Sequence, residues 1–514
     1  MAPLETPGSS RRSGRRWLRA VAWLAAWISL GGCAATRFEN YPLAQGQVNA
    51  ERRVLDVSDK QRPFILVAIS GGGSRAADLG WVVLRELRNI RYAQGARGGS
   101  LADDVAVVSS VSGGSVIAAH FALYGPDGLD RFEPDFLVPD NMQTLGMDAA
   151  NPITWLQLAI TGASRIDAVE QLFDAQLFKN RTFADLNQRG RPYLILNATD
   201  MASGEVFAFT PRRFDDICSD LDREPISAGV GASAAVPVAL TPVALQNYTV
   251  QDCQGRAMPK WIIDDLKGRY EPYVNIEQYK RARYANDLRH GDNAFRKIDY
   301  LYLEDGGLAD NLAVHGLLET ISSPYAAPVT AATGSDGSHT VLEAINTGQI
   351  RTLVVIVINA RSDPANAIYQ SPSRPGIVQM VGSVTSVPID STSASVNSQL
   401  DELLADLDAA GGGAPNDPQF AGLRVYAVQI DFDQLRADDA AQLDLRNRVK
   451  AIPTSWTITQ DNRAIVERVG KTLLYQHPCF QRLLLDLGIG AASPGFALDP
   501  VFARTGCPQA ADRP

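Results

Sequence analysis

The chain has 514 residues, 45% of them hydrophobic and 20% charged, a globular balance that excludes a chain disordered throughout. Its formal net charge of −9 argues against a nucleic-acid partner, because phosphate backbones require a basic surface. The length admits two or three average domains, or one large α/β domain with elaborations.

Residues 1–32 have the features of an export signal. Arginines at 11, 12, 15, 16 and 19 precede the apolar stretch AVAWLAAWISL at 20–30, which is too short to span a bilayer. Leu30-Gly31-Gly32-Cys33 resembles a bacterial lipobox, in which the cysteine becomes the lipidated first residue. Ala34 follows that cysteine, which implies delivery to the outer membrane, facing the periplasm. The alternative is a plain signal peptide with a coincidental cysteine.

Cleavage before Cys33 would lower the net charge to −13 and leave residues 33–62 as a linker between a lipid anchor and the folded chain. The expected partner of the anchor is a membrane surface. No apolar run after Cys33 is long enough to predict a membrane span. The sequence makes no prediction of the oligomeric state.

Four cysteines follow Cys33, and an even number of cysteines in an exported chain predicts disulfides. Three connectivities are possible, of which the local one is favoured: Cys218 with Cys253, and Cys479 with Cys507. The spacing matches no Cys-x-x-Cys or Cys/His zinc pattern, so no metal site is predicted.

Near-continuous apolar segments alternate with helical patterns along the chain. This alternation predicts a three-layer αβα fold with a mostly parallel central sheet. The predicted strands lie at 62–70, 104–111, 192–200, 299–304, 352–360 and 424–430. Parallel strands collect functional groups where they end, and these ends carry Ser70, Ser112, Asp200 and Asp305.

Residues 126–185 and 246–298 fit no sheet unit and are interpreted as helical or irregular insertions. Residues 321–514 are expected to form a C-terminal extension of strands and helices packed on the catalytic domain. A Ser/Pro-rich stretch begins near 361, and helices are predicted at 394–408, 437–452 and 460–476.

Three motifs could carry chemistry: SGGGSRA at 70–76, SVSGG at 110–114 and DGG at 305–307. A serine on a strand-to-helix turn exposes its hydroxyl at a helix N-terminus, which favours developing negative charge. The triple glycine fits either an oxyanion hole or a dinucleotide fingerprint, Gly71-x-Gly73-x-x-Ala76. The fingerprint needs an acid at the end of the next strand, which ends in serines, so the oxyanion hole is preferred. A non-enzymatic nucleotide-binding lipoprotein remains an alternative.

The order of glycine loop, serine elbow and Asp-Gly-Gly resembles the patatin-like phospholipase family over residues 63–320, and the loop is similar to that of the related cytosolic group IV phospholipases. ASAAVP at 232–237 and DGGLADNLAV at 305–314 also resemble family segments. The resemblance implies a patatin-like fold and a serine lipid acyl hydrolase that needs no cofactor and acts on phospholipids or lysophospholipids through an acyl-enzyme.

The resemblance also assigns roles to residues. Ser112 is the nucleophile, Asp305 its base, the Gly71, Gly72 and Gly73 amides form the oxyanion hole, and Arg75 supports that loop. Gly114, Gly306 and Gly307 complete the motifs. The family's serine motif is G-x-S-x-G, and Ser110 replaces its first glycine here, a small side chain that we expect the elbow to tolerate.

A histidine triad is the alternative mechanism. His120 is eight residues beyond Ser112 and out of reach, whereas His315, His339 and His477 follow Asp305 in the chain order of an α/β-hydrolase. His315 is expected to pack on its helix and His339 to lie in an exposed loop. The alternative is therefore an esterase with a Ser112–Asp305–His477 triad.

Overall fold

The structure is a computed structural model. It describes residues 40–49, 55–92, 99–145, 165–237, 239–253, 256–267, 276–291, 294–322, 329–330, 340–362, 377–411, 422–489 and 496–509. The expected signal peptide, Cys33 and His339 lie outside the described residues.

In the described part of the chain, the central sheet has eight strands in the order β12-β11-β2-β5-β6-β9-β8, with β7 paired to β6. The strands are β2 (Phe64–Ile69), β5 (Val105–Ser110), β6 (Tyr193–Asp200), β7 (Val206–Phe209), β8 (Val243–Gln246), β9 (Tyr300–Asp305), β11 (Thr352–Asn359) and β12 (Arg424–Asp431). Neighbours from β12 to β6 are parallel, whereas β9 is antiparallel to both β6 and β8. The predicted mostly parallel sheet is confirmed.

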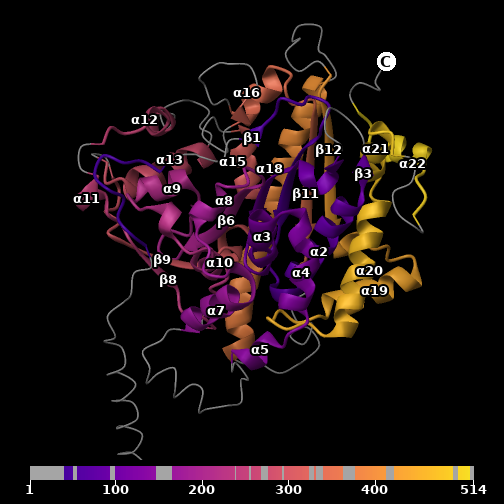
Figure 1. The fold of residues 1–514 in the computed structure, drawn as a ribbon, viewed down its shortest axis with the longest axis horizontal. Coiled ribbons are helices and arrows are strands. Elements are labelled where there is room, and N and C mark those ends of the chain that lie inside the picture. The colour runs from indigo at the N-terminus through magenta and orange to yellow at the C-terminus, as the bar shows by residue number, and fades with distance from the viewer. Residues whose placement is uncertain are drawn as a thin grey trace, which may run out of the picture.

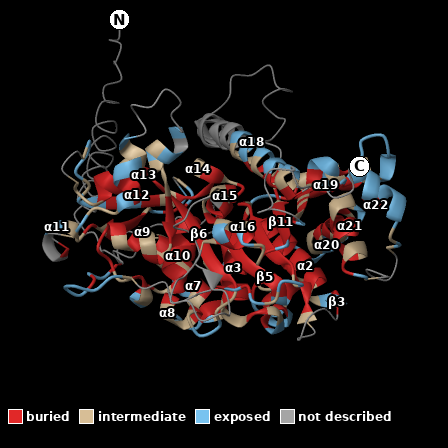
Figure 2. Ribbon diagram, turned by 90° about the horizontal axis from the view of Figure 1, so that it is seen from above, coloured by how far each residue is buried: buried red, intermediate tan, exposed pale blue. Residues whose placement is uncertain are grey.

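Helices cover both faces of this sheet, because successive strand residues point to opposite sides. Ile65, Val67 and Ile69 of β2 belong to one hydrophobic core, and Leu66 and Ala68 to the other. The first core includes α2 (Gly73–Asn89), α3 (Gly113–Tyr124), α10 (Ile226–Ser233) and α20 (Gln460–Gln476). The second includes α15 (Val314–Ser322), α16 (Val341–Asn346) and α18 (Ile377–Gly411). Figure 2 shows α15 and α18 on the side of the sheet opposite α2 and α3. This is the expected three-layer arrangement.

The C-terminal extension is part of the sheet as well as a covering for it. β11 pairs with β2 in parallel and β12 pairs with β11, so residues beyond 320 extend the central sheet (Figure 1). α18 begins at Ile377, well before the predicted start at 394, inside the stretch interpreted as Ser/Pro-rich. Valines at 378, 381, 384 and 387 recur at a spacing compatible with a helix, a pattern that the composition obscures.

Residues 126–185 and 246–298 contain short helices. The remaining helices are α4 (Leu129–Phe132), α5 (Asn141–Thr144), α7 (Arg165–Phe173), α8 (Phe183–Leu186), α9 (Pro211–Asp216), α11 (Thr249–Asp252), α12 (Lys260–Lys267), α13 (Ile276–Leu288), α14 (Gly307–Asp310), α19 (Ala440–Lys450), α21 (Pro478–Asp486) and α22 (Pro500–Gly506). Two small sheets pair β1 (Leu55–Asp56) with β10 (Val329–Thr330) and β3 (Arg91–Tyr92) with β4 (Gly99–Ser100).

None of the helices in the described residues combines the length and the apolar character needed to cross a bilayer.

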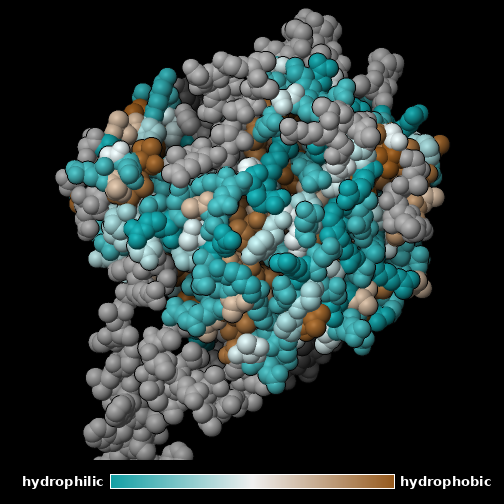
Figure 3. Space-filling model, viewed as in Figure 1, coloured by the Kyte–Doolittle hydropathy of each residue, from teal (hydrophilic) through white to brown (hydrophobic). Residues whose placement is uncertain are grey.

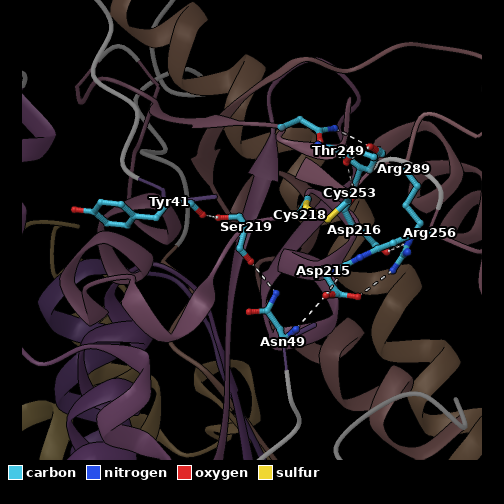
Figure 4. The surroundings of a disulfide bond; sticks show 12 residues. Tyr41, Asn49, Asp215, Asp216, Cys218, Ser219, Thr249, Cys253, Arg256 and Arg289 are labelled. Carbon is cyan, nitrogen blue, oxygen red and sulfur yellow. Dashed lines mark hydrogen bonds and ion pairs between the residues drawn. A yellow bond between two sulfur atoms is a disulfide. The ribbon is translucent and has the colours of Figure 1, made fainter. Parts of the chain in front are cut away.

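The structure contains both disulfides of the favoured pairing. Cys218 bonds Cys253 with a Cα–Cα distance of 6.1 Å, and Cys479 bonds Cys507 with a Cα–Cα distance of 4.9 Å. The first lies beside residues 40–49, where the Asn49 amide donates to Asp215 and the Ser219 hydroxyl donates to the Tyr41 carbonyl (Figure 4). This part of the expected linker therefore packs against the folded chain.

Candidate active site

Asp305 and Ser112 meet at one edge of the sheet, although their strands run in opposite directions. Ser110, the last residue of β5, is level with Ile69 of β2 and Leu196 of β6. β6 continues four residues further, and β9 returns along this extension until Asp305 pairs with Ala198. The antiparallel β9 therefore ends about where the parallel strands end, which brings its last carboxylate to the predicted edge.

The backbone at Ser112 is in an unusual conformation. Its φ of 52° is in the left-handed region, which non-glycine residues rarely adopt, and α3 begins at the next residue. Ser112 is 6% exposed, and its amide donates to the Ser233 hydroxyl over 2.9 Å. A side chain at Gly114 would place its Cβ 2.5 Å from the Ser70 carbonyl oxygen, so glycine is required there. This geometry is that of a strained strand-to-helix elbow.

Ser110 is accommodated because its hydroxyl has partners away from the elbow. It accepts from Ser115 over 3.1 Å and donates to the Ile195 carbonyl over 3.4 Å. The departure from the family's first glycine therefore adds a buried hydroxyl with hydrogen-bond partners and no collision.

Asp305 is the candidate general base for Ser112. The Gly307 amide donates to Asp305 Oδ1 over 2.8 Å, and an interaction with the Ser112 side chain also lowers the pKa of this carboxylate. Burial raises the pKa of Asp305 to about 6, although both interactions act in the opposite direction. A Cβ at Gly306 would collide with the Asn197 carbonyl oxygen, so the turn after Asp305 requires a residue without one.

ASAAVP at 232–237 connects the two sides of this site. The Ser233 hydroxyl accepts the Ser112 amide and donates to the Asn197 carbonyl, and the Ser233 carbonyl accepts the Gly306 amide. The Ala235 carbonyl accepts the Asp305 amide over 2.9 Å. The sequence marked this segment by resemblance only, and it offered no signal for the role of Ser233.

The glycine loop supplies fewer free amides than the sequence suggests. The Gly71 amide donates to the Asn311 carbonyl over 3.1 Å, so it is not available to an oxyanion. Gly72 and Gly73 have φ angles of 139° and 60°, conformations that favour glycine. Gly73 and Gly113 each begin a helix, where amides lack intrahelical acceptors, and a Cβ on Gly113 would collide with the Gly73 backbone. The loop and the elbow therefore touch, with helix N-termini side by side.

Residues 452–457 of the C-terminal extension hold the glycine loop from outside. The Ser455 carbonyl accepts the Ser74 amide over 2.7 Å and the Ser74 hydroxyl over 2.6 Å. Arg75 donates to the carbonyls of Ala360 and Ile452, and burial lowers the pKa of its guanidinium to about 10. The amino-acid sequence gives no signal for this segment, because any residue type can supply a backbone carbonyl.

The same segment reaches the first insertion. The Asn141 amide group donates to the Trp456 carbonyl over 3.0 Å, and the Trp456 ring packs edge-on against Phe173. The Thr457 hydroxyl accepts the Met142 amide and donates to Asp140. Residues 452–457 thus bridge the glycine loop and the insertion.

The other predicted groups lie elsewhere. Asp200 accepts from the Ser203 and Tyr284 hydroxyls, and the Ser70 hydroxyl accepts the Ala360 amide. The ring nitrogens of His477 lie within hydrogen-bond distance of the backbone amides of Gln429 on β12 and Cys479 on α21, at the far end of the sheet from β9. The structure therefore does not assemble the alternative triad.

The dinucleotide interpretation also fails on geometry. It requires the N-terminus of α2 to receive a pyrophosphate. The Ser74 amide at that terminus donates to Ser455, whose backbone lies so close to Gly73 that a Cβ there would collide with it.

Comparisons with known proteins give one family match and remote likenesses to solved structures. Residues 67–318 match the family model described as patatin-like phospholipase. A solved structure of human GIVD cytosolic phospholipase A2 with methyl gamma-linolenyl fluorophosphonate is 11% identical, with a TM-score of 0.34, over 85% of this chain. The chain spans 62% of the length of that human chain. Another solved structure of human GIVD cytosolic phospholipase A2 is 10% identical, with a TM-score of 0.30, over 66% of this chain and 53% of the other. No curated protein sequence matches.

Proposed function

Because residues 67–318 are a patatin-like phospholipase domain, we propose that the protein is a lipid acyl hydrolase in which Ser112 and Asp305 form a catalytic dyad. The observation that carries this proposal is a buried aspartate, Asp305, whose carboxylate interacts with the side chain of Ser112, a serine held at a φ of 52° on a strand-to-helix elbow. The proposed substrates are phospholipids or lysophospholipids, and the reaction needs no cofactor.

In the proposed first half-reaction, Ser112 Oγ attacks the ester carbonyl carbon while Asp305 accepts its proton. The carbonyl oxygen becomes an oxyanion, which the amides of Gly72, Gly73 and Gly113 stabilise together with the N-termini of α2 and α3. The tetrahedral intermediate collapses when the C–O bond breaks, and the departing alkoxide takes the proton from Asp305. The acyl chain then remains on Ser112.

The second half-reaction reverses these roles. Asp305 takes a proton from water, whose oxygen attacks the acyl-enzyme carbonyl, and Ser112 leaves as an alkoxide that recovers the proton. The raised pKa of Asp305, about 6, suits this task, because the group is ionised at neutral pH but is more basic than an exposed aspartate.

We also propose that the mature chain is an outer-membrane lipoprotein anchored through Cys33, as the lipobox resemblance suggests. Mass spectrometry of the mature N-terminus tests this directly. A Cys33→Ser protein is expected to leave the membrane fraction, and an unmodified native N-terminus would contradict the anchor.

A fluorophosphonate probe tests the dyad, because only an activated serine reacts with it. We expect labelling of the parent protein at Ser112 and no labelling of Ser112→Ala with unchanged thermal unfolding. A panel of phospholipids and lysophospholipids with mass-spectrometric detection of released fatty acid then identifies the substrate. Labelling that persists in Ser112→Ala, or a folded protein inert to the probe, would contradict the proposal.

A further inference from the structure

The β8–β9 side of the molecule exposes a group of aromatic and basic residues, which we name the hairpin patch. Its apolar members are Met201, Phe295, Tyr300 and Tyr302, which are 58%, 72%, 53% and 42% exposed. Arg296 and Lys297 between them are exposed cations. On the face drawn in Figure 3, hydrophilic residues cover most of the described surface, and hydrophobic ones form small separate groups.

Contacts among these residues and their neighbours make the patch continuous. The Arg296 guanidinium donates to the Ala202 carbonyl, and the Met201 amide donates to the Tyr302 carbonyl over 2.9 Å. The Arg283 guanidinium lies 4.3 Å from the centre of the Phe295 ring. Tyr300 and Tyr302 are two residues apart on β9 and so share one face of that strand. Asp299, the acid between Lys297 and Tyr300, lies 3.8 Å from His290.

The patch lies on the catalytic side of the sheet. Asp305 is already beyond the level of Ser110, and the earlier residues of antiparallel β9 continue outward in the same direction. At about 3.3 Å per residue, Tyr302 and Tyr300 lie roughly 10 and 16 Å further out along the strand than Asp305. A flat surface that contacts the patch would therefore face the edge that holds Ser112.

The chain also enters the described structure beside this patch. Asn40 exchanges two hydrogen bonds with Gln246 of β8, at 2.8 and 2.9 Å, and Gln246 is paired with Tyr300. Cys33, the expected lipidation site, is seven residues before Asn40. Seven residues span at most about 25 Å, so a lipid on Cys33 would be held near the patch.

We propose that the hairpin patch docks on an anionic lipid bilayer and so presents the Ser112–Asp305 edge to the membrane surface. Aromatic side chains insert at the headgroup level, and neighbouring Arg and Lys side chains contact lipid phosphates. The net charge of −13 expected for the mature chain makes the rest of it repel an anionic bilayer, which favours docking by this patch alone. The inference rests on the proposed lipid substrate.

Vesicle flotation of the chain without residues 1–32 tests the proposal, with Cys33→Ser as the parent so that neither the export signal nor a lipid anchor contributes. We expect this parent to bind phosphatidylcholine vesicles that contain phosphatidylglycerol. Phe295→Ser with Tyr300→Ser should weaken the partition coefficient about tenfold. Arg296→Gln and Lys297→Gln should each weaken it about fivefold, and salt should reduce that effect. The matched control is Val501→Ser with Phe502→Ser, two residues of α22 with exposures of 72% and 43%, which should bind like the parent.

Hydrolysis of a soluble chromogenic ester without vesicles should be unchanged in every patch variant, which also shows that each remains folded. The proposal would be overturned by a parent that does not bind the vesicles or by patch variants that bind as well as the parent. A control variant that loses as much binding as the patch variants would also overturn it. Ser112→Ala should still bind, because docking and chemistry are separate. A protein that binds vesicles through the patch but resists the fluorophosphonate probe would contradict the proposed function and leave the docking surface standing.

Discussion

The serine elbow and the glycine loop touch through Gly113 and Gly73, yet different parts of the chain hold them. The elbow is held by Ser233 and Ser115, within the span that matches the family model. The loop is held largely by Ser455 and Ile452, far outside that span. Residues within the span that matches the family model therefore hold the proposed nucleophile and base, whereas residues of the C-terminal extension hold the loop proposed to supply oxyanion donors.

The largest expected effect lies on the elbow side. Asp305→Asn should reduce turnover by about 10²–10⁴-fold, because the amide cannot accept the Ser112 proton. His477→Ala should leave turnover within a few-fold of the parent protein. A collapse in a folded His477→Ala protein would instead support a triad.

The same Asp305→Asn protein should be more stable at pH 8. The raised pKa means that the folded state holds the proton more tightly than the unfolded state. The stability contribution of Asp305 is therefore greatest below about pH 4 and falls as the pH rises through about 6. The amide removes that loss, so thermal unfolding should shift upward at pH 8 and not at pH 4. An equal shift at both values would contradict the burial of this charge.

The next effect tests the loop side. Gly73→Ala should lower kcat by about 10²–10³-fold, the usual cost of losing an oxyanion donor, because the new Cβ collides with Ser455. Gly348→Ala is the matched control: its φ of 64° is close to the 60° of Gly73, but no atom lies within 4 Å of the added Cβ. It should lose stability from backbone strain alone and keep its turnover. Equal turnover in the two variants would contradict the proposed role of Ser455 in positioning the glycine loop.

A smaller effect separates the two hydrogen bonds that Ser74 donates to the Ser455 carbonyl. Ser74→Ala removes the hydroxyl bond to Ser455 and keeps the amide bond, so kcat should fall about fivefold with little change in KM. Ser74→Thr retains the hydroxyl and should restore most of the rate. The fluorophosphonate reaction should slow in parallel with kcat, which a purely structural defect would not require. A change confined to KM would assign the contact to substrate binding.

The sequence predicts the elbow and the sheet better than it predicts their surroundings. β2 and β5 are buried on both faces, so their continuous apolar runs are visible, and the glycines after Ser112 mark the turn. β7 and β8 are short, and the antiparallel direction of β9 follows from pairing that no local pattern encodes. The Gly71 amide donates to the Asn311 carbonyl, and the Ser74 amide donates to the Ser455 carbonyl, so both contacts use backbone carbonyls as acceptors. Residue types cannot reveal such contacts before the chain is folded.

The smallest effect concerns the charge beside the base. We expect kcat/KM to rise with pH through an acidic limb near 6, because Asp305 must lose its proton before it can accept one from Ser112. Burial is the main cause of this raised pKa, and the neighbouring Glu304 carboxylate adds to it by repulsion. Glu304→Gln removes a like charge, which favours ionised Asp305, so the limb should move to lower pH while the plateau rate stays the same. Salt should shift the limb of the parent in the same direction and that of Glu304→Gln less, because screening weakens only the charge–charge part. A limb that moves to higher pH in Glu304→Gln would mean that Glu304 stabilises the ionised base, and the electrostatic account of Asp305 would then be wrong.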